Sequence, residues 1–153
     1  MTAPATKTVP ALAIADIADA DVAAVIALWQ ACGLTRPWND PAADIALARR
    51  RPNSTILIGR DGDAIVATAM VGHDGHRGWV YYVATDPDRR AKGYGRSIMT
   101  ATEDWLRAAD IPKQQLLVRT ENDGVAAFYQ SIGYGEQQVL FFTRWLDGRE
   151  PPR

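Results

Sequence analysis

A short run of glycines and cations lies in the middle of the chain, and its composition suits an anionic ligand. Residues 90–96 combine Arg90, Lys92 and Arg96 with Gly93 and Gly95. If a helix begins at Gly95 or Arg96, its first backbone N–H groups are unpaired and the positive end of its dipole points toward this run. Two glycines allow phosphates to approach that backbone closely. The run therefore predicts a loop that binds a di- or polyphosphate.

Two better-known phosphate-binding loops do not fit this spacing. A P-loop requires Lys-Ser or Lys-Thr after its glycines, and the only such pair, Lys7-Thr8, lies in the N-terminal segment. A dinucleotide fingerprint requires a third glycine or alanine three residues after Gly95, where the chain has Ile98. The spacing that is present is Arg90-x-x-Gly93-x-Gly95.

The segments around the run predict how it is positioned. Residues 79–85 are aromatic and β-branched, as in a buried strand, and residues 96–109 carry apolar residues at helical spacing. Residues 115–119 predict a further strand, parallel to 79–85 because a helix joins the two. Ligands bind at the carboxyl ends of such strands, where this run lies.

The remaining elements follow from periodicity and turn signals. Before the run we expect a strand over 11–14, a helix with Val22, Val25, Ile26 and Trp29 on one face, and a second helix capped by Asp40-Pro41. Strands over 55–59 and 64–71 form a hairpin, and with 79–85 they make an antiparallel meander. After it we expect a helix capped by Asn122 or Asp123, with Val125, Phe128 and Ile132 inward, and a last strand over 139–145.

A second motif makes the resemblance to a family specific. It reads Asn122-x-x-x-Ala126-x-x-Tyr129-x-x-x-Gly133-Tyr134, and it follows the first motif after one predicted helix and one strand. Together, in this order, the two motifs resemble the signature of the GNAT family of N-acetyltransferases. The stretches 36–41 and 74–78 further resemble the small bacterial YpeA-like acetyltransferases, a subgroup of that family.

The resemblance covers about residues 8–146, which we predict to be a single domain with flexible termini over 1–7 and 147–153. It implies the GNAT fold, an α/β (α+β) architecture with a central, mixed, mostly antiparallel, twisted sheet. About six to seven strands and about four helices are expected, with strands 4 and 5 splayed apart.

The resemblance also implies an acetyl-CoA-dependent N-acetyltransferase. A primary amine, either a protein amino group or a small molecule, would attack the thioester directly in a ternary complex. The rival hypothesis is a CoA-binding sensor or interaction module that has kept the loop and lost turnover.

The family motifs assign residues to acetyl-CoA. Backbone N–H groups of the glycine run would hold the pyrophosphate, and Arg89, Lys92 or Arg96 would contact the other phosphate of the nucleotide. Pantetheine would pair with the strand over 79–85, one of whose N–H groups would polarise the thioester carbonyl. The expected cofactor-binding residues are Val83, Thr85, Arg90, Lys92, Gly93, Tyr94, Gly95, Arg96 and Asn122.

Tyr129 matches the general-acid position of the family, where a proton donor assists the departing CoA thiolate. The alternative is an aromatic residue that merely packs, but Phe128 already supplies the inward ring. Many GNAT enzymes carry a Glu base on the fourth strand, whereas residues 79–85 contain no carboxylate. The acceptor amine must be neutral to attack, and the sequence leaves the general base open. The candidates are Tyr81, Tyr82, Asp40, Asp74 and a water relay, and the remaining alternative is an amine that arrives already neutral.

Two further loops contain residues suited to recognising the acceptor. A linker needs neither an indole nor a guanidinium, so the loop over 36–39 suggests a lid, although a structural role fits equally well. The 74–76 turn is either solvated or near the substrate amine. The expected acceptor-site residues are Arg36, Trp38, Asn39, Asp74, His76 and Tyr81.

Composition excludes several other classes. The chain has 153 residues, a net charge of −1 and one cysteine, so we expect no nucleic-acid partner and a reducing, cytoplasmic location. Asp residues interrupt the first apolar segment, which argues against a signal peptide or membrane partner. The only histidines, His73 and His76, lack companions for a metal site. Cys32 most simply packs on its helix rather than carrying an acyl group, and we expect a monomer or homodimer.

Overall fold

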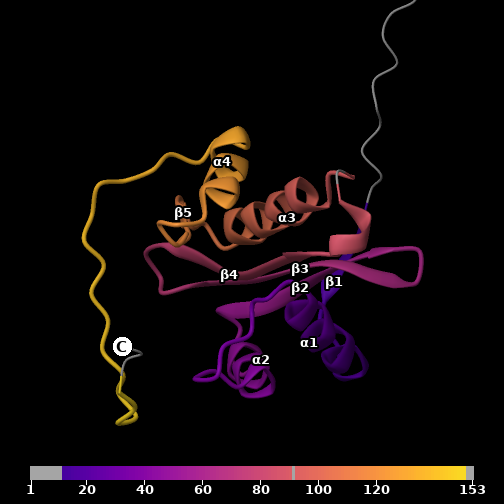
Figure 1. The fold of residues 1–153 in the computed structure, drawn as a ribbon, viewed down its shortest axis with the longest axis horizontal. Coiled ribbons are helices and arrows are strands. Elements are labelled where there is room, and N and C mark those ends of the chain that lie inside the picture. Colours follow the sequence, from indigo (N-terminus) through magenta and orange to yellow (C-terminus); the bar gives the residue numbers. More distant parts are fainter. Residues whose placement is uncertain (1–11, 91, 151–153) are drawn as a thin grey trace, which may run out of the picture. The chain divides into compact units, whose positions relative to one another are not determined.

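The computed structural model describes residues 12–90 and 92–150, which form two compact units over residues 12–117 and 118–150 (Figure 1). Each unit is described by itself below. The predicted flexible segment over 1–7 and the start of the predicted domain at residue 8 lie outside the described residues.

The first unit is built on one mixed sheet in the order β1-β2-β3-β4-β5. Its strands are β1 (Ala13–Asp16), β2 (Ser54–Asp61), β3 (Ala64–His73), β4 (Gly78–Thr85) and β5 (Gln114–Gln115). Successive strands from β1 to β4 pair antiparallel, and β5 pairs parallel to β4. The predicted meander and the predicted parallel crossover are both confirmed.

Helices cover both faces of this sheet (Figure 1). The helices α1 (Val22–Ala31) and α2 (Pro41–Arg49) pack on one face, and α3 (Tyr94–Ala108) covers the other. A short 3-10 turn over Asp19–Asp21 precedes α1, and another over Pro87–Arg89 follows β4. As predicted, the Asp40 side chain caps α2 by accepting from the N–H groups of Ala42 and Ala43.

The cores on the two faces are apolar. Trp29 and Val25 of α1 join Ile45 of α2 and Ile56 and Ile58 of β2 in one cluster. On the other face, α3 turns Ile98, Met99 and Leu106 inward, and all three are almost fully buried. These cores hold α1, α2 and α3 against the sheet, whose strand β4 leads into the glycine run.

The second unit contains α4 (Asp123–Ser131) and an irregular segment that follows it. Asn122 caps α4, since its side chain accepts from Val125 N at 3.3 Å. The predicted inward face is only partly right: Phe128 and Ile132 are half-buried, but Val125 is exposed and Tyr129 is the buried residue of this helix. Helical spacing alone did not distinguish the face with Val125, Phe128 and Ile132 from the adjacent face that carries Tyr129.

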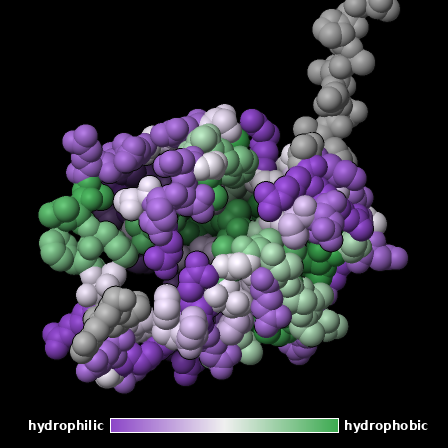
Figure 2. Space-filling model, viewed as in Figure 1, coloured by the Kyte–Doolittle hydropathy of each residue, from purple (hydrophilic) through white to green (hydrophobic). Residues whose placement is uncertain are grey.

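The predicted number of strands is also wrong. The described residues hold five strands and four α-helices rather than six to seven strands, because 139–145 is irregular and 115–119 shrinks to Gln114–Gln115. Val139, Leu140 and Phe142 are exposed, and Figure 2 shows hydrophobic side chains gathered over this segment. An apolar, aromatic run has strand propensity, but a strand requires a paired neighbour that composition does not supply.

None of the helices in the described residues has the length and apolar content that crossing a membrane requires.

Candidate active site

The N-terminus of α3 leaves backbone donors unused. The helix begins at Tyr94, with Gly93 as its N-cap at φ 76°, in the left-handed region that favours glycine. The first backbone bond at this end runs from Ser97 N to Gly93 O at 3.1 Å. The N–H groups of residues 93–96 precede that bond and lie at the positive end of the helix dipole. This end of α3 therefore has the geometry of an anion site.

Cations surround these donors. Arg90, Lys92 and Arg96 are exposed, and no ion pair engages them within the described part of the chain. Arg89 instead pairs with Asp86 at 3.5 Å. Backbone donors, a helix dipole and free cations together fit a pyrophosphate group.

Tyr94 has a second role that its sequence context did not reveal. Its side chain is almost fully buried, and its hydroxyl donates to the Asp61 carboxylate at the end of β2. That hydrogen bond raises the pKa of Tyr94, so the hydroxyl stays protonated. The side chain thus anchors the first turn of α3 to the sheet, and the backbone of Tyr94 is the part of the residue left to take part in an anion site.

Within residues 12–117, one edge of β4 lacks a strand partner over most of its length. Only Gly78 and Trp79 pair with β5, although β4 continues to Thr85. Asp86 N donates to Val66 O on β3 at 2.8 Å, and neighbouring residues of a strand direct their backbone groups to opposite edges. Val83 and Thr85 therefore direct theirs away from β3, toward the edge that β5 leaves open within residues 12–117.

A β-bulge interrupts β4 just before this edge. Thr68 lies opposite Ala84 and Met70 opposite Tyr81, so Tyr82 and Val83 together face Ala69. Tyr82 has φ 50°, an uncommon conformation for a residue with a bulky side chain. Neither the bulge nor the left-handed tyrosine has a sequence signal, and both were missed.

Cys32 packs next to this strand. Its thiol donates to the Thr85 carbonyl at 3.1 Å, and burial raises the pKa of the thiol. A half-buried thiol with a raised pKa is a poor nucleophile. The packing interpretation of Cys32 is favoured over an acyl carrier.

The loop over 36–39 uses its polar groups to hold its own shape. The Arg36 guanidinium donates to Gly33 O at 2.7 Å and to Thr35 O at 3.1 Å. Asn39 N donates to Arg36 O at 3.0 Å. Trp38 and Asn39 are half-buried. The arginine is therefore a loop-shaping residue, and the indole of Trp38 is the larger surface that this loop offers.

The turn between β3 and β4 is held in the same way. The Asp74 carboxylate accepts from Arg77 N at 2.8 Å and His76 N at 2.9 Å, and these bonds keep the pKa of Asp74 below its usual range. His76 is exposed. The solvated-turn interpretation accounts for the contacts of Asp74.

Tyr81 presents a ring on β4 beyond this turn. It is 47% exposed and stacks on Trp79 at a centroid distance of 6.5 Å. Burial of its hydroxyl raises the pKa of Tyr81. A tyrosine with a raised pKa stays neutral near pH 7 and is a weak candidate for a general base.

Tyr129 and Asn122 belong to the second unit. Tyr129 is buried, and its ring contacts Phe128 at 5.1 Å and Tyr134 at 5.9 Å. Burial raises the pKa of Tyr129 to about 12. Its hydroxyl has no hydrogen-bond partner within residues 118–150. A protonated, unpaired phenol is chemically suited to donate a proton.

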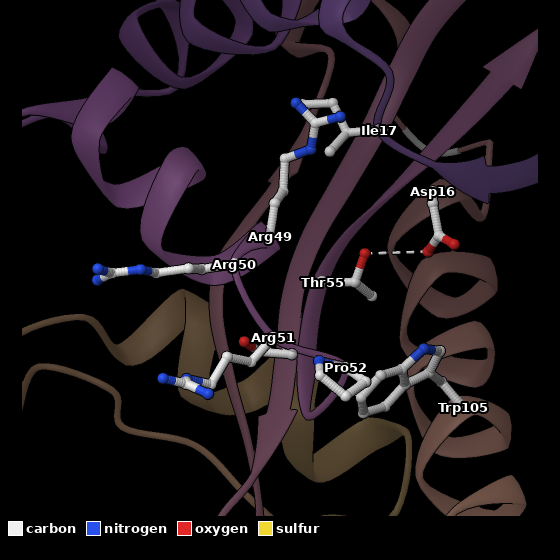
Figure 3. A pocket seen from close by; sticks show the side chains of 9 residues that line it. Asp16, Ile17, Arg49, Arg50, Arg51, Pro52, Thr55 and Trp105 are labelled. Atoms are coloured by element: carbon white, nitrogen blue, oxygen red, sulfur yellow. Dashed lines mark hydrogen bonds between the residues drawn. The ribbon is translucent and has the colours of Figure 1, made fainter.

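A hollow elsewhere in the first unit does not include the predicted site residues. It has a volume of about 420 Å³ and lies at the C-terminal end of α2, lined by Arg49, Arg50, Arg51, Pro52 and Trp105 among others (Figure 3). Arg49 pairs with Asp19 at 2.7 Å, and Figure 3 shows Arg50 and Arg51 pointing away from the indole. Its cations do not converge on one point.

No group of three potential metal ligands occurs among the residues that the structure describes.

Comparisons with known proteins agree with this fold and with the sequence motifs. Residues 22–134 match the model of the acetyltransferase (GNAT) family. An acetyltransferase of Yersinia enterocolitica is 36% identical over 126 residues, which cover 82% of this chain and 89% of the relative. The chain therefore belongs to the GNAT family, a family of N-acetyltransferases.

Solved structures show the same fold. A structure from Agrobacterium tumefaciens has a TM-score of 0.74 at 23% identity and covers 87% of this chain and 99% of its own. The structure of AAC(6′)-Iy in complex with the bisubstrate analog CoA-S-monomethyl-acetylneamine has a TM-score of 0.75 at 14% identity, with coverage of 88% and 97%. At these identities the likeness concerns the fold alone.

Proposed function

We propose that the protein transfers an acetyl group from acetyl-CoA to a primary amine by direct attack in a ternary complex, within a single domain over residues 8–146. The observation that carries this function is the open N-terminus of α3, with its left-handed Gly93 and exposed cations. The family match supports the single domain, since it runs through both compact units from residue 22 to 134.

Acetyl-CoA supplies the activated acetyl thioester, and residues of the chain bind and orient it. The N–H groups of residues 92–96 hold the pyrophosphate, while Arg90, Lys92 and Arg96 add charge. The open edge of β4 at Val83 and Thr85 pairs with the amide-rich pantetheine, as an added strand would. The Val83 N–H polarises the thioester carbonyl as negative charge develops there. Asn122 caps the helix that carries Tyr129.

Tyr129 donates a proton to the departing thiolate. This role is supported by its match to the family motif, by its unpaired hydroxyl in residues 118–150 and by a pKa of about 12, which keeps the proton in place at neutral pH.

The acceptor binds beside residues Arg36, Trp38, Asn39, Asp74, His76 and Tyr81. Arg36 and Asp74 act by shaping their loops, since their polar groups are already bonded there. Trp38 and Tyr81 supply ring surface, and His76 supplies an exposed imidazole. The acceptor is a small-molecule amine or a protein amino group, and the reducing cytoplasm suits a chain whose one cysteine is a free thiol.

The test is a thiol-release assay with acetyl-CoA and a panel of amines containing free amino acids, a polyamine, an aminoglycoside and a peptide with a free N-terminus. We expect thiol release that depends on at least one amine. Tight binding of acetyl-CoA without thiol release for any amine would favour the sensor hypothesis. Absence of acetyl-CoA binding would contradict both.

A further inference from the structure

The bulge in β4 places one residue in a conformation that its side chain disfavours. Tyr82 has φ 50°, and of the other described non-glycine residues only Asp110 has a positive φ. Such conformations persist where surrounding contacts hold them, and they concentrate at functional sites. The contacts that hold Tyr82 come from three separate elements.

The first contact is to β3. The Thr68 hydroxyl, which is fully buried, donates to the Tyr82 carbonyl at 3.1 Å. The same hydroxyl oxygen accepts from Trp29 Nε1 of α1 at 2.8 Å. Because the indole can only donate, the single proton of the hydroxyl is left for Tyr82. Trp29 therefore sets the direction in which Thr68 donates.

The other two contacts hold the side chain of Tyr82. Its ring stacks on the Trp29 indole with centroids 3.9 Å apart and planes 7° from parallel. Its hydroxyl donates to the Asp44 carboxylate of α2 at 2.6 Å. We call Trp29, Asp44, Thr68 and Tyr82 the bulge clamp.

The direction of one peptide group follows from this clamp. The peptide between Tyr82 and Val83 is planar and trans, so its C=O and N–H point in opposite directions. Thr68 holds the carbonyl on the β3 side. The Val83 N–H is thereby aimed at the other edge of β4, where β5 is absent after Trp79.

We propose that the bulge clamp is the positioning device of the acetyl-transfer site, with Thr68 as the positioning residue that aims the Val83 N–H at the thioester carbonyl. This inference rests on the proposed function, which places acetyl-CoA along that edge. In this proposal the four side chains act through the backbone of β4 rather than on the reacting atoms.

Thr68→Val tests the clamp, because valine keeps the volume of threonine and removes the hydroxyl. The matched control is Thr102→Val. Thr102 of α3 is likewise fully buried. Its hydroxyl donates to Met99 O at 2.7 Å and accepts from Gln114 Nε2 at 3.1 Å, so it also takes part in two hydrogen bonds, both away from the bulge. Thr68→Ser restores the hydroxyl and should restore the function.

The measurement is isotope-edited infrared spectroscopy of [1-¹³C]acetyl-CoA bound to each protein, with calorimetric titration to confirm binding. We expect the carbonyl stretch to move to lower frequency on binding to wild type, Thr68→Ser and Thr102→Val, and to return toward the free value in Thr68→Val. With the best amine of the panel, kcat of Thr68→Val should fall by roughly tenfold to a hundredfold while acetyl-CoA affinity stays near wild type.

If the carbonyl stretch of acetyl-CoA bound to Thr68→Val shifts as far as in wild type, the proposed role of the bulge clamp is wrong. It is also wrong if wild type binds acetyl-CoA without any shift of this stretch. A wild type that binds no acetyl-CoA would instead reject the proposed function itself. If Thr68→Val does not fold, the half-buried Asp44 gives the same test. Asp44→Asn keeps an acceptor for Tyr82 and should keep the carbonyl shift, whereas Asp44→Leu should reduce it, and equal shifts in the two variants would count against the clamp.

Discussion

The loop before α3 and the turn between β3 and β4 each place a glycine in the left-handed region, at φ 76° for Gly93 and φ 84° for Gly75. Their polar groups are used differently. In the turn, Asp74 accepts from the backbone of His76 and Arg77, so the carboxylate is occupied. At the loop, the N–H groups of residues 93–96 and the cations of Lys92 and Arg96 are not engaged within the described chain.

This difference separates residues whose polar groups are used within their own loop from residues whose polar groups remain unused within the described chain. Both stretches contain residue types associated with binding, and the sequence left the role of the turn open. The hydrogen bonds show that the turn satisfies itself, whereas the helix end does not. On the proposed acceptor side, the polar groups of Arg36 and Asp74 are likewise bonded within their own loops. We therefore propose that the rings of Trp38 and Tyr81, rather than these groups, would contact the acceptor.

The largest effect is expected at Tyr129. Like the N–H groups at the start of α3, its hydroxyl has no hydrogen-bond partner within its own unit. Tyr129→Phe should lower turnover by roughly 10²–10⁴-fold with little change in acetyl-CoA affinity, because only the proton donor is removed. Since the pKa of Tyr129 is about 12, wild-type turnover should not decline between pH 7 and 10 through ionisation of this group.

Steady-state kinetics with a responsive amine and calorimetric titration of acetyl-CoA check this prediction. Wild-type turnover in Tyr129→Phe would remove the hydroxyl from the mechanism. Equal losses in turnover and in cofactor affinity would make Tyr129 a binding residue.

Removing the free cations of the loop should have the next largest effect. The double variant of Lys92→Ala and Arg96→Ala should bind CoA about tenfold more weakly, since charge-assisted contacts to phosphate are lost. The difference from wild type should shrink at high salt, because exposed charges are screened. Arg50→Ala and Arg51→Ala remove two cations at the end of α2 and serve as the control, and an equal loss there would indicate a nonspecific charge effect.

Trp38→Ala tests whether ring surface recognises the acceptor. Loss of the indole should raise KM for the acceptor by roughly fivefold, as truncation of an aromatic contact does, and leave acetyl-CoA affinity unchanged. Leu47→Ala is the control, because Leu47 of α2 is 64% exposed. If Trp38→Ala unfolds the protein, as a thermal melt would show, Trp38 is a core residue and the lid hypothesis is wrong.

The smallest effect is expected at Asp74. Its pKa is lowered by the backbone donors of Arg77 and His76, so its stabilisation is present above about pH 3.8 and is lost as the pH falls through the lowered value. Asp74→Asn keeps the acceptor oxygen. The variant should therefore match wild type in acceptor KM at pH 7, and it should lose less stability than wild type between pH 6 and 3, measured by urea unfolding. A large rise in KM would mean that the carboxylate contacts the acceptor.

The sequence predicted best where a local rule determines the structure. The glycine spacing located the N-terminus of α3 to within two residues, and Asp40-Pro41 located the start of α2. It failed where a partner decides the outcome. Residues 139–145 have strand composition but are irregular in the structure. The buried face of α4 was predicted only in part, because Tyr129 is more deeply buried than Phe128 and Val125 is exposed.

The bulge clamp was beyond prediction for the same reason. Trp29, Asp44, Thr68 and Tyr82 lie on four different elements, and no spacing rule links them before the fold brings them together. A tyrosine in the left-handed region also contradicts local preference. The sequence did show that β4 lacks the glutamate common in the family. It gave no sign of the bulge clamp that holds this strand.

The most direct test of the account compares the two left-handed glycines. Gly93→Ala and Gly75→Ala introduce the same side chain at φ 76° and φ 84°, and each should cost roughly 1–2 kcal/mol of folding stability. A Cβ at Gly75 meets nothing within 4 Å, so the stability cost there comes from φ alone. Calorimetric titration of acetyl-CoA into the folded variants should give wild-type affinity for Gly75→Ala and a loss of at least about tenfold for Gly93→Ala. Equal affinities in the two folded variants would contradict the assignment of the α3 N-terminus as the cofactor site.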